Sequence, residues 1–221
     1  MKRSEVNQYI GYAMKFMAEN RFYLPKWAYW TPSDWETMKD RCEEIVENGL
    51  GWDITDFGSG NFLKTGLTLV TLRNGNLDKP SKQYCEKIML VRNNQVTPMH
   101  YHVLKTEDII NRGGGMLCMK LWNSEPDGSL SEGSLEVKID SIRTTVRSGE
   151  TVYLKPGQSI CYTPYLYHTF WAEGGDCLIG EVSSVNDDKK DNCFREDRGR
   201  FSAIEEDEEI RHYLCNEYPV K

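Results

Sequence analysis

Two histidines one residue apart, His100 and His102, are the clearest sign of chemistry in this 221-residue sequence. They lie in a strand-like segment, where alternate side chains face the same side, so both imidazoles can reach one ion. Glu107 follows close behind, and a turn can bring its carboxylate to the same point. Two imidazoles with a carboxylate suit manganese, iron, zinc, cobalt or nickel. The spacing therefore predicts a divalent metal site without choosing the metal.

A fourth ligand should come from another strand, because three groups from one hairpin cover only one side of an ion. His168 lies in a strand-like segment after a proline turn and is the natural candidate among the chain's 4 histidines. His212 lies in a charged segment that looks helical, so we expect it at the surface. The predicted ligand set is His100, His102, Glu107 and His168.

The N-terminal residues have the apolar spacing of helices. A first helix is expected from Ser4, its N-cap, to Asn20. A second helix should begin with a capping box of Thr31 and Asp34 and end at the pair Asn48-Gly49.

After Gly51 the sequence changes to short β-rich segments separated by turn residues, which is typical of an antiparallel sandwich or barrel. The expected strands are 66–73, 84–92, 96–103, 116–122, 134–139, 142–147, 150–154, 159–163, 167–173 and 176–184. The length suits one domain with one core. We expect a helical arm over 1–50, a β-barrel over 51–185, and a closing loop with a C-terminal segment over 186–221.

The charge balance excludes some partners. With 27 basic and 34 acidic residues the net charge is −7, which argues against nucleic acid or an anionic membrane. The first ten residues lead into an amphipathic helix rather than a signal peptide, and no apolar run is long enough to span a membrane. We expect a cytoplasmic protein that binds a small molecule.

The predicted ligands also fit a known pattern. The chain resembles the first cupin motif at His100, His102, Glu107 and Gly114. It matches the second motif more loosely, at Gly149, Pro164 and His168, and lacks the glycine that follows the proline. Asn94 stands where cupins have a leading glycine, and asparagine tolerates the same left-handed backbone. The resemblance implies an all-β cupin (jelly-roll) barrel, here with N-terminal helices.

More narrowly, nearly the whole chain resembles the D-lyxose isomerases. The similar segments are WAYWTPSDW at 27–35, TPMHYH at 97–102 with Lys105 and Glu107, and GEVSSVNDD at 180–188. The resemblance implies a manganese-dependent aldose-ketose isomerase that interconverts D-lyxose and D-xylulose, and often D-mannose and D-fructose, as a cytoplasmic homodimer.

Such a reaction needs a base and an acid beside the sugar. Glu181 is the expected base if it faces inward, with metal charge keeping it ionised and burial raising its pKa. Its alternative role is to orient a ligand imidazole. Lys105 is either a proton donor or a solvated lysine. Asp188 and Arg195 either bind distal hydroxyls or are solvated charges. Separate candidates for base and acid favour proton transfer through a cis-enediol.

Two other functions are compatible with a metal-binding cupin, because a fold does not fix its chemistry. One is a different enzyme class, such as a non-haem iron dioxygenase. The other is a non-catalytic sugar-binding or storage protein with a structural metal.

Overall fold

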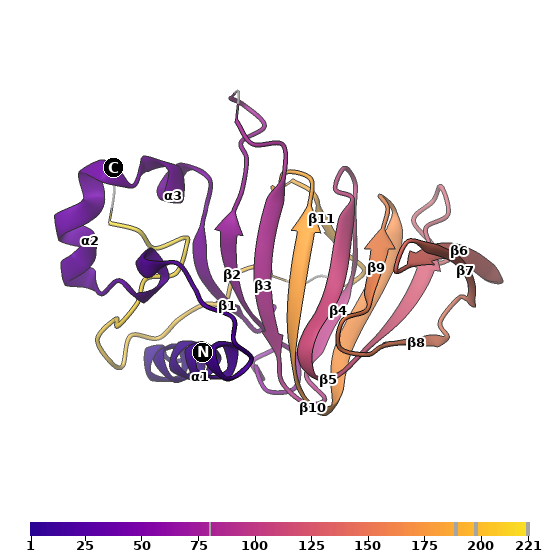
Figure 1. Cartoon of the computed structure of the whole chain (residues 1–221), viewed down its shortest axis with the longest axis horizontal. Helices are drawn as coiled ribbons and strands as arrows, with labels where there is room; N and C mark the ends of the chain where they lie inside the picture. Colours follow the sequence, from indigo (N-terminus) through magenta and orange to yellow (C-terminus); the bar gives the residue numbers. More distant parts are fainter. Residues whose placement is uncertain (80, 188–189, 197–198, 220–221) are drawn as a thin grey trace.

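The structure is a computed structural model that describes residues 1–79, 81–187, 190–196 and 199–219. The helices lie together at one end, beside both chain termini, and the strands form the rest of the molecule (Figure 1). The helical segments are α1 (Arg3–Glu19), η1 (Lys26–Tyr29), α2 (Pro32–Met38), η2 (Lys39–Arg41) and α3 (Glu43–Glu47).

The strands of the described residues belong to one antiparallel sheet that curves into a barrel. They are β1 (Gly51–Thr55), β2 (Leu67–Arg73), β3 (Cys85–Val91), β4 (Val96–His102), β5 (Glu107–Asn123), β6 (Ser134–Ile139), β7 (Ile142–Arg147), β8 (Thr151–Leu154), β9 (Ser159–Tyr162), β10 (Leu166–Ser183) and β11 (Asn192–Phe194). The main order is β1-β2-β3-β10-β5-β9-β6-β7, with β4 between β10 and β11 and β8 beside β5. The predicted cupin-type barrel with N-terminal helices is confirmed.

Strand alternation divides the apolar side chains between two cores. On β10, Cys177 and Ile179 face the barrel interior, whereas Leu178 packs under α1. On β3, Met89 faces the interior and Ile88 faces the helix. Successive side chains of a strand point to opposite faces. The same alternation therefore directs Lys87 of β3 and Glu181 of β10 into the barrel.

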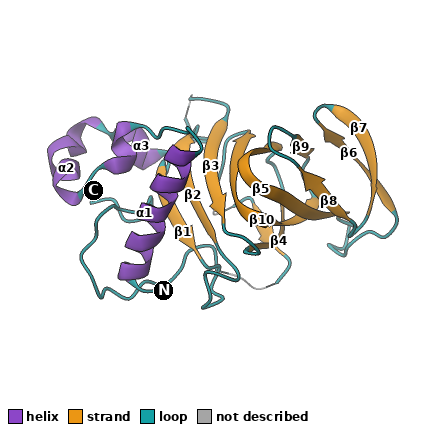
Figure 2. Cartoon of the chain, turned by 60° about the horizontal axis from the view of Figure 1, so that its bottom comes forward, coloured by secondary structure: helices purple, strands orange, loops and turns teal. Residues whose placement is uncertain are grey.

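Helix α1 covers the outer face of the sheet at β1 and β2 (Figure 2). Its apolar stripe of Val6, Ile10, Ala13 and Met17 is fully buried there. The indole Nε1 of Trp52, on β1, donates a 2.7 Å hydrogen bond to the carbonyl of Ala28 in η1. The helical arm therefore backs the strands, and the interior of the barrel is left for other side chains.

The helices differ from the prediction in two places. Ser4 is not the N-cap, because α1 begins at Arg3 and the Ser4 hydroxyl instead donates to Asp207 at 2.7 Å. The predicted second helix is interrupted, since Cys42 has φ −131° and ψ 28°, outside the helical range, and this separates α2 from α3. Its capping box is confirmed: Asp34 accepts the backbone N–H of Thr31 at 2.8 Å.

The strands differ from the prediction most clearly at Gly174-Gly175, which separate two of the predicted strands. β5 and β10 are single long strands, so the two strands predicted over 167–173 and 176–184 are one strand with a register shift between Glu173 and Cys177. The glycines of both strands meet there, and a Cβ on Gly114 would overlap the carbonyl oxygen of Asp176. β1 was not predicted. β11 lies in the segment predicted to be a closing loop, and it pairs with β4.

Asn94 adopts φ 62°, as predicted for the residue that replaces the leading cupin glycine. Within the described residues, none of the helices combines the length and apolar character needed to cross a bilayer.

The close contact between the glycines of β5 and β10 gives a first testable prediction. Gly114 has φ 85° and meets a backbone carbonyl, so Gly114→Ala adds left-handed strain and an overlap. We expect it to lower the free energy of unfolding by about 2–5 kcal/mol. Gly11→Ala is the control, because nothing lies within 4 Å of its added Cβ, and it should stabilise α1 by about 0.5–1 kcal/mol. Urea denaturation measures the stability of both variants. Equal midpoints would show that Gly114 is not required where β5 meets β10.

Candidate active site

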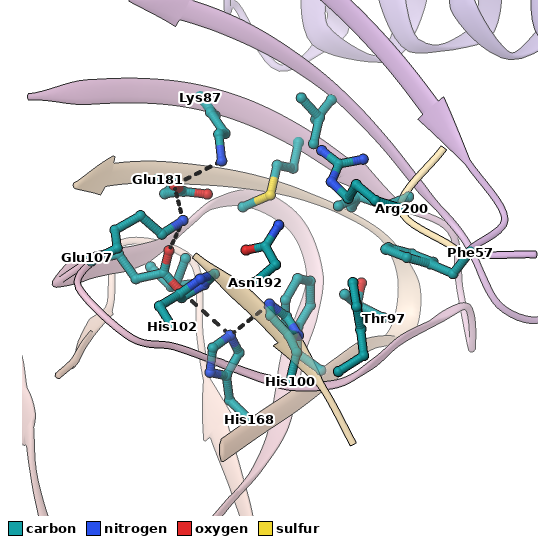
Figure 3. Close-up of a pocket in the computed structure, with 17 residues that line it drawn as sticks. Phe57, Lys87, Thr97, His100, His102, Glu107, His168, Glu181, Asn192 and Arg200 are labelled. Carbon is teal, nitrogen blue, oxygen red and sulfur yellow. Dashed lines mark hydrogen bonds and ion pairs between the residues drawn. The ribbon is translucent and has the colours of Figure 1, made fainter. Parts of the chain in front are cut away.

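Three histidines converge inside the barrel (Figure 3). His100 and His102 alternate on β4, and His168 on β10 lies opposite His100 in the strand register. One ring nitrogen from each lies within 4.8 Å of the others. His102 and His168 are buried and His100 is half-buried. The structure thus brings together the three histidines that the sequence predicted as ligands.

Backbone contacts fix the proton on two of these rings. The Nδ1 of His100 lies 2.8 Å from the carbonyl of Pro98, and that of His168 lies 3.0 Å from the carbonyl of Leu166. A carbonyl only accepts, so each Nδ1 carries the hydrogen and each Nε2 presents a lone pair. Burial lowers the pKa of His168 to about 4 and that of His100 well below its usual value. Both rings are therefore neutral at neutral pH.

Two neutral Nε2 atoms that face each other are a poor pair without a cation between them. The Nε2 atoms of His100 and His168 are 3.1 Å apart, and both are acceptors. Neutral imidazoles with converging lone pairs are the donor set that a divalent metal ion requires. These residues therefore fit the predicted metal.

Glu107 supplies negative charge beside the histidines. It is the first residue of β5, and its Oε1 lies 3.4 Å from Nε2 of His102 and 3.5 Å from Nε2 of His168. Burial would raise the pKa of Glu107, but Lys105 and the neighbouring His102 outweigh it and hold the pKa well below its usual value. An ionised carboxylate at this point suits the proposed fourth ligand.

A chain of alternating charges extends from Glu107 across the pocket. Lys105 Nζ lies 2.7 Å from Glu107 Oε2 and 2.9 Å from Glu181 Oε1. Glu181 Oε1 also lies 3.2 Å from Lys87 Nζ (Figure 3). Each of the four side chains is at most 5 % exposed. The alternative of a solvated Lys105 is therefore wrong, and Glu181 faces inward.

The two lysines also determine the charge state of Glu181. Burial would raise the pKa of this carboxyl, as the sequence predicted, but Lys105 and Lys87 reverse the direction and lower it below its usual value. Burial would lower the pKa of Lys105, but Glu107 and Glu181 raise it. Glu181 is thus an ionised carboxylate, as a base must be. It contacts these ammonium groups and Ser183 rather than a histidine ring.

Sequence reasoning missed two charged residues of the pocket. Lys87 interrupts the apolar strand β3, and its alternation with Met89 was the available signal that it points inward. Arg200 lies across the pocket from the histidines (Figure 3). It pairs with Asp53 of β1 at 2.6 Å. No local spacing pointed to Arg200, because the C-terminal segment brings it there.

The other residues singled out in the sequence are Asp188, Arg195 and His212. Asp188 is outside the described residues. Arg195 donates its backbone N–H to the carbonyl of Met99 at 3.0 Å and lines a separate hollow rather than the histidine pocket. His212 is not in a helix, and its half-buried ring lies 3.1 Å from the carbonyl of Trp30.

The fold is shared with solved sugar isomerases. The L-ribose isomerase of Cellulomonas parahominis superposes over 93% of this chain and 98% of its own, with a TM-score of 0.60 and 14% identity. The Acinetobacter sp. DL28 L-ribose isomerase, in complex with L-ribose, gives the same coverage, TM-score and identity. At this identity the likeness concerns the fold alone, and it defines the class of architecture: a β-barrel of the type on which these isomerases are built.

Sequence comparison identifies the family. The family model for D-lyxose isomerase matches residues 1–218. The D-lyxose/D-mannose isomerases of Escherichia coli O157:H7 and Serratia proteamaculans are each 47% identical over 99% of this chain and 98% of their own. The chain belongs to the D-lyxose isomerase family and is an isomerase. The dioxygenase and storage-protein alternatives are not supported by these relatives.

The convergence of histidines leads to a metal-binding prediction. Removing one ligand removes one bond from the ion, so the alanine variants of His100, His102, Glu107 and His168 should each lose the metal. His212→Ala is the control and should keep it, since its ring contacts a backbone carbonyl far from the site. Elemental analysis of the purified variants measures the bound metal. Stoichiometric metal in one of the four would remove that residue from the ligand set.

Proposed function

We propose that this protein is a manganese-dependent aldose-ketose isomerase that interconverts D-lyxose and D-xylulose, and D-mannose and D-fructose. The names of its 47% identical relatives support the sugars. The observation that carries the proposal is the buried pair Glu181–Lys105 beside the three histidines. A carboxylate and an ammonium next to a metal site are the groups that moving one proton between two carbons requires.

His100, His102, Glu107 and His168 would hold the ion. When bound, it would supply Lewis acidity that stabilises the negative charge developing on the sugar during isomerisation. A three-histidine, one-glutamate set includes manganese among its suitable ions, and we propose Mn²⁺.

Glu181 is the proposed base. Its carboxylate removes the proton from C2 of the aldose, and the electron pair of that C–H bond forms the C1–C2 double bond. The π pair of the C1 carbonyl moves to O1, which takes up a proton to give a cis-enediol. Returning the proton to C1 completes the ketose, and in net terms a hydroxyl proton has passed from O2 to O1. The ionised state that Lys105 and Lys87 impose on Glu181 makes it ready to accept a proton at neutral pH.

Lys105 is the proposed proton donor to a sugar oxygen. Its ammonium already lies 2.9 Å from Glu181, so the proton that moves between the oxygens and the proton that moves between the carbons are handled by neighbouring groups. Lys87 holds Glu181 from the other side. Because Glu181 has a lysine on each side, its carboxylate stays directed into the pocket when the substrate engages one of the two lysines.

Sugar hydroxyls beyond C2 need further partners. Arg200 occupies the pocket wall away from the histidines and is a suitable donor. Asp188 remains a proposed ligand of the distal hydroxyls, whereas Arg195, which lines the separate hollow, is not retained in that role. A pocket of this kind discriminates weakly between a pentose and its one-carbon-longer analogue, by about 1–3 kcal/mol. We also propose a cytoplasmic homodimer.

The activity is tested by incubating Mn²⁺-loaded protein with D-lyxose and with D-mannose and following ketose formation. We expect D-xylulose and D-fructose, loss of activity with a chelator, and recovery on adding Mn²⁺. Metal-loaded protein that forms neither ketose would overturn the proposed substrates.

Glu181→Gln tests the base with little change in shape. The amide cannot accept a proton at neutral pH, so we expect turnover to fall by a factor of about 10²–10⁴ with metal content unchanged. Glu173→Gln is the control on the same strand, since Glu173 lies at the exposed bend of β10 and accepts from Trp171. Ketose assays and metal analysis measure the two effects. A Glu181→Gln enzyme that recovers with excess Mn²⁺ would instead assign Glu181 a role in metal binding.

A further inference from the structure

His102 differs from the other two histidines in what its second ring nitrogen contacts. His100 and His168 each donate Nδ1–H to the backbone carbonyl two residues earlier. Within the described part of the chain, the Nδ1 of His102 is buried without a hydrogen-bond partner. The carboxylate of Asp191 lies beside this nitrogen, with its Oδ2 3.8 Å from Nδ1.

Backbone hydrogen bonds fix the position of the Asp191 carboxylate. It is only 4 % exposed. Its Oδ1 accepts the backbone N–H of Leu104 at 2.6 Å, and its Oδ2 accepts that of Lys105 at 3.2 Å. Its own carbonyl accepts the N–H of Val103 at 3.2 Å. The carboxylate therefore holds the turn that joins His102 to Lys105 and Glu107.

The residue after Asp191 pairs with β4, the strand that carries His100 and His102. Asn192 begins β11 and is paired with His102 in the strand register. Asp191 thus approaches His102 from the neighbouring strand, with one oxygen already aimed toward its free nitrogen. A shift of less than 1 Å would convert the 3.8 Å separation into a hydrogen bond.

We infer that Asp191 is a positioning residue for the metal centre: its carboxylate accepts Nδ1–H of His102 and leaves Nε2 of that ring free to bind the ion. The inference rests on the proposed metal site. Metal-binding histidines commonly donate their other N–H to a carboxylate or carbonyl, which fixes the tautomer and makes the ligand more basic. His100 and His168 use carbonyls for this purpose, and His102 uses Asp191.

The tautomer is tested first in the unmodified protein loaded with Zn²⁺, which is diamagnetic. Long-range ¹H–¹⁵N NMR of the histidine rings should show His102 bound through Nε2 with a protected proton on Nδ1. His100 and His168 should show the same state and serve as internal references. Binding of His102 through Nδ1, or an Nδ1 proton that exchanges freely, would overturn the inference without any variant.

Asp191→Asn then tests the carboxylate. Asparagine keeps an oxygen for the turn but loses the charge, so we expect the Nδ1 proton of His102 alone to lose protection and Zn²⁺ affinity to fall by about 10–100-fold. Asp56→Asn is the matched control. Asp56 is also buried, and it accepts two backbone N–H groups, from Gly58 and Gly60, without facing a histidine. It should change neither readout.

These measurements separate the inference from the proposed function. Unchanged zinc affinity and an unchanged His102 signal in Asp191→Asn would overturn the role of Asp191 and leave the metal site standing. Failure to isomerise D-lyxose would overturn the proposed substrates and leave these binding results untouched.

Discussion

Four charged side chains inside the barrel must neutralise one another, and the site depends on this constraint. Lys87, Glu181, Lys105 and Glu107 alternate in sign, and each is almost fully buried. Breaking one buried pair leaves an uncompensated charge and typically costs about 3–5 kcal/mol. The alternation therefore holds the carboxylates in place and keeps both ionised. The proposed base and the proposed metal ligand are therefore both ionised before any substrate enters.

Pairing of strands that are far apart in the sequence brings these charges together. Inward-facing positions of β3, β5 and β10 each carry one of these charges, and Lys105 lies in the turn between β4 and β5. The apolar residues beside them fill the same interior. Neutral histidines from β4 and β10 complete the pocket. The apolar cluster under helix α1 includes Ile88 of β3 and Leu178 of β10, so these two strands of the site are packed on both faces. Rigid strands of this kind hold functional groups more accurately than loops do.

The sequence predicted what depends on short-range spacing. The histidine pair of β4 and the nearby glutamate are local features. Glu181 was predicted as the base on the condition that it faces inward, and the structure meets this condition. Lys87 and Asp191 were missed because their roles depend on pairing between distant strands. The glycines of β10 resemble a turn in sequence, and only their contact with those of β5 shows that they form a bend within one strand. Asp188 lies outside the described residues.

The central claim is that a carboxylate in this pocket carries a proton between C2 and C1 of the sugar. Isomerisation of D-lyxose in heavy water, stopped at early turnover and analysed by NMR, tests it most directly. A proton held on Glu181 exchanges with solvent, so the account predicts deuterium on C1 of the ketose. Running D-lyxose deuterated at C2 in ordinary water gives the opposing test. Complete transfer of that deuterium to C1, with no solvent label in the heavy-water reaction, would contradict proton exchange through Glu181 and point to a hydride shift or to a fully shielded base.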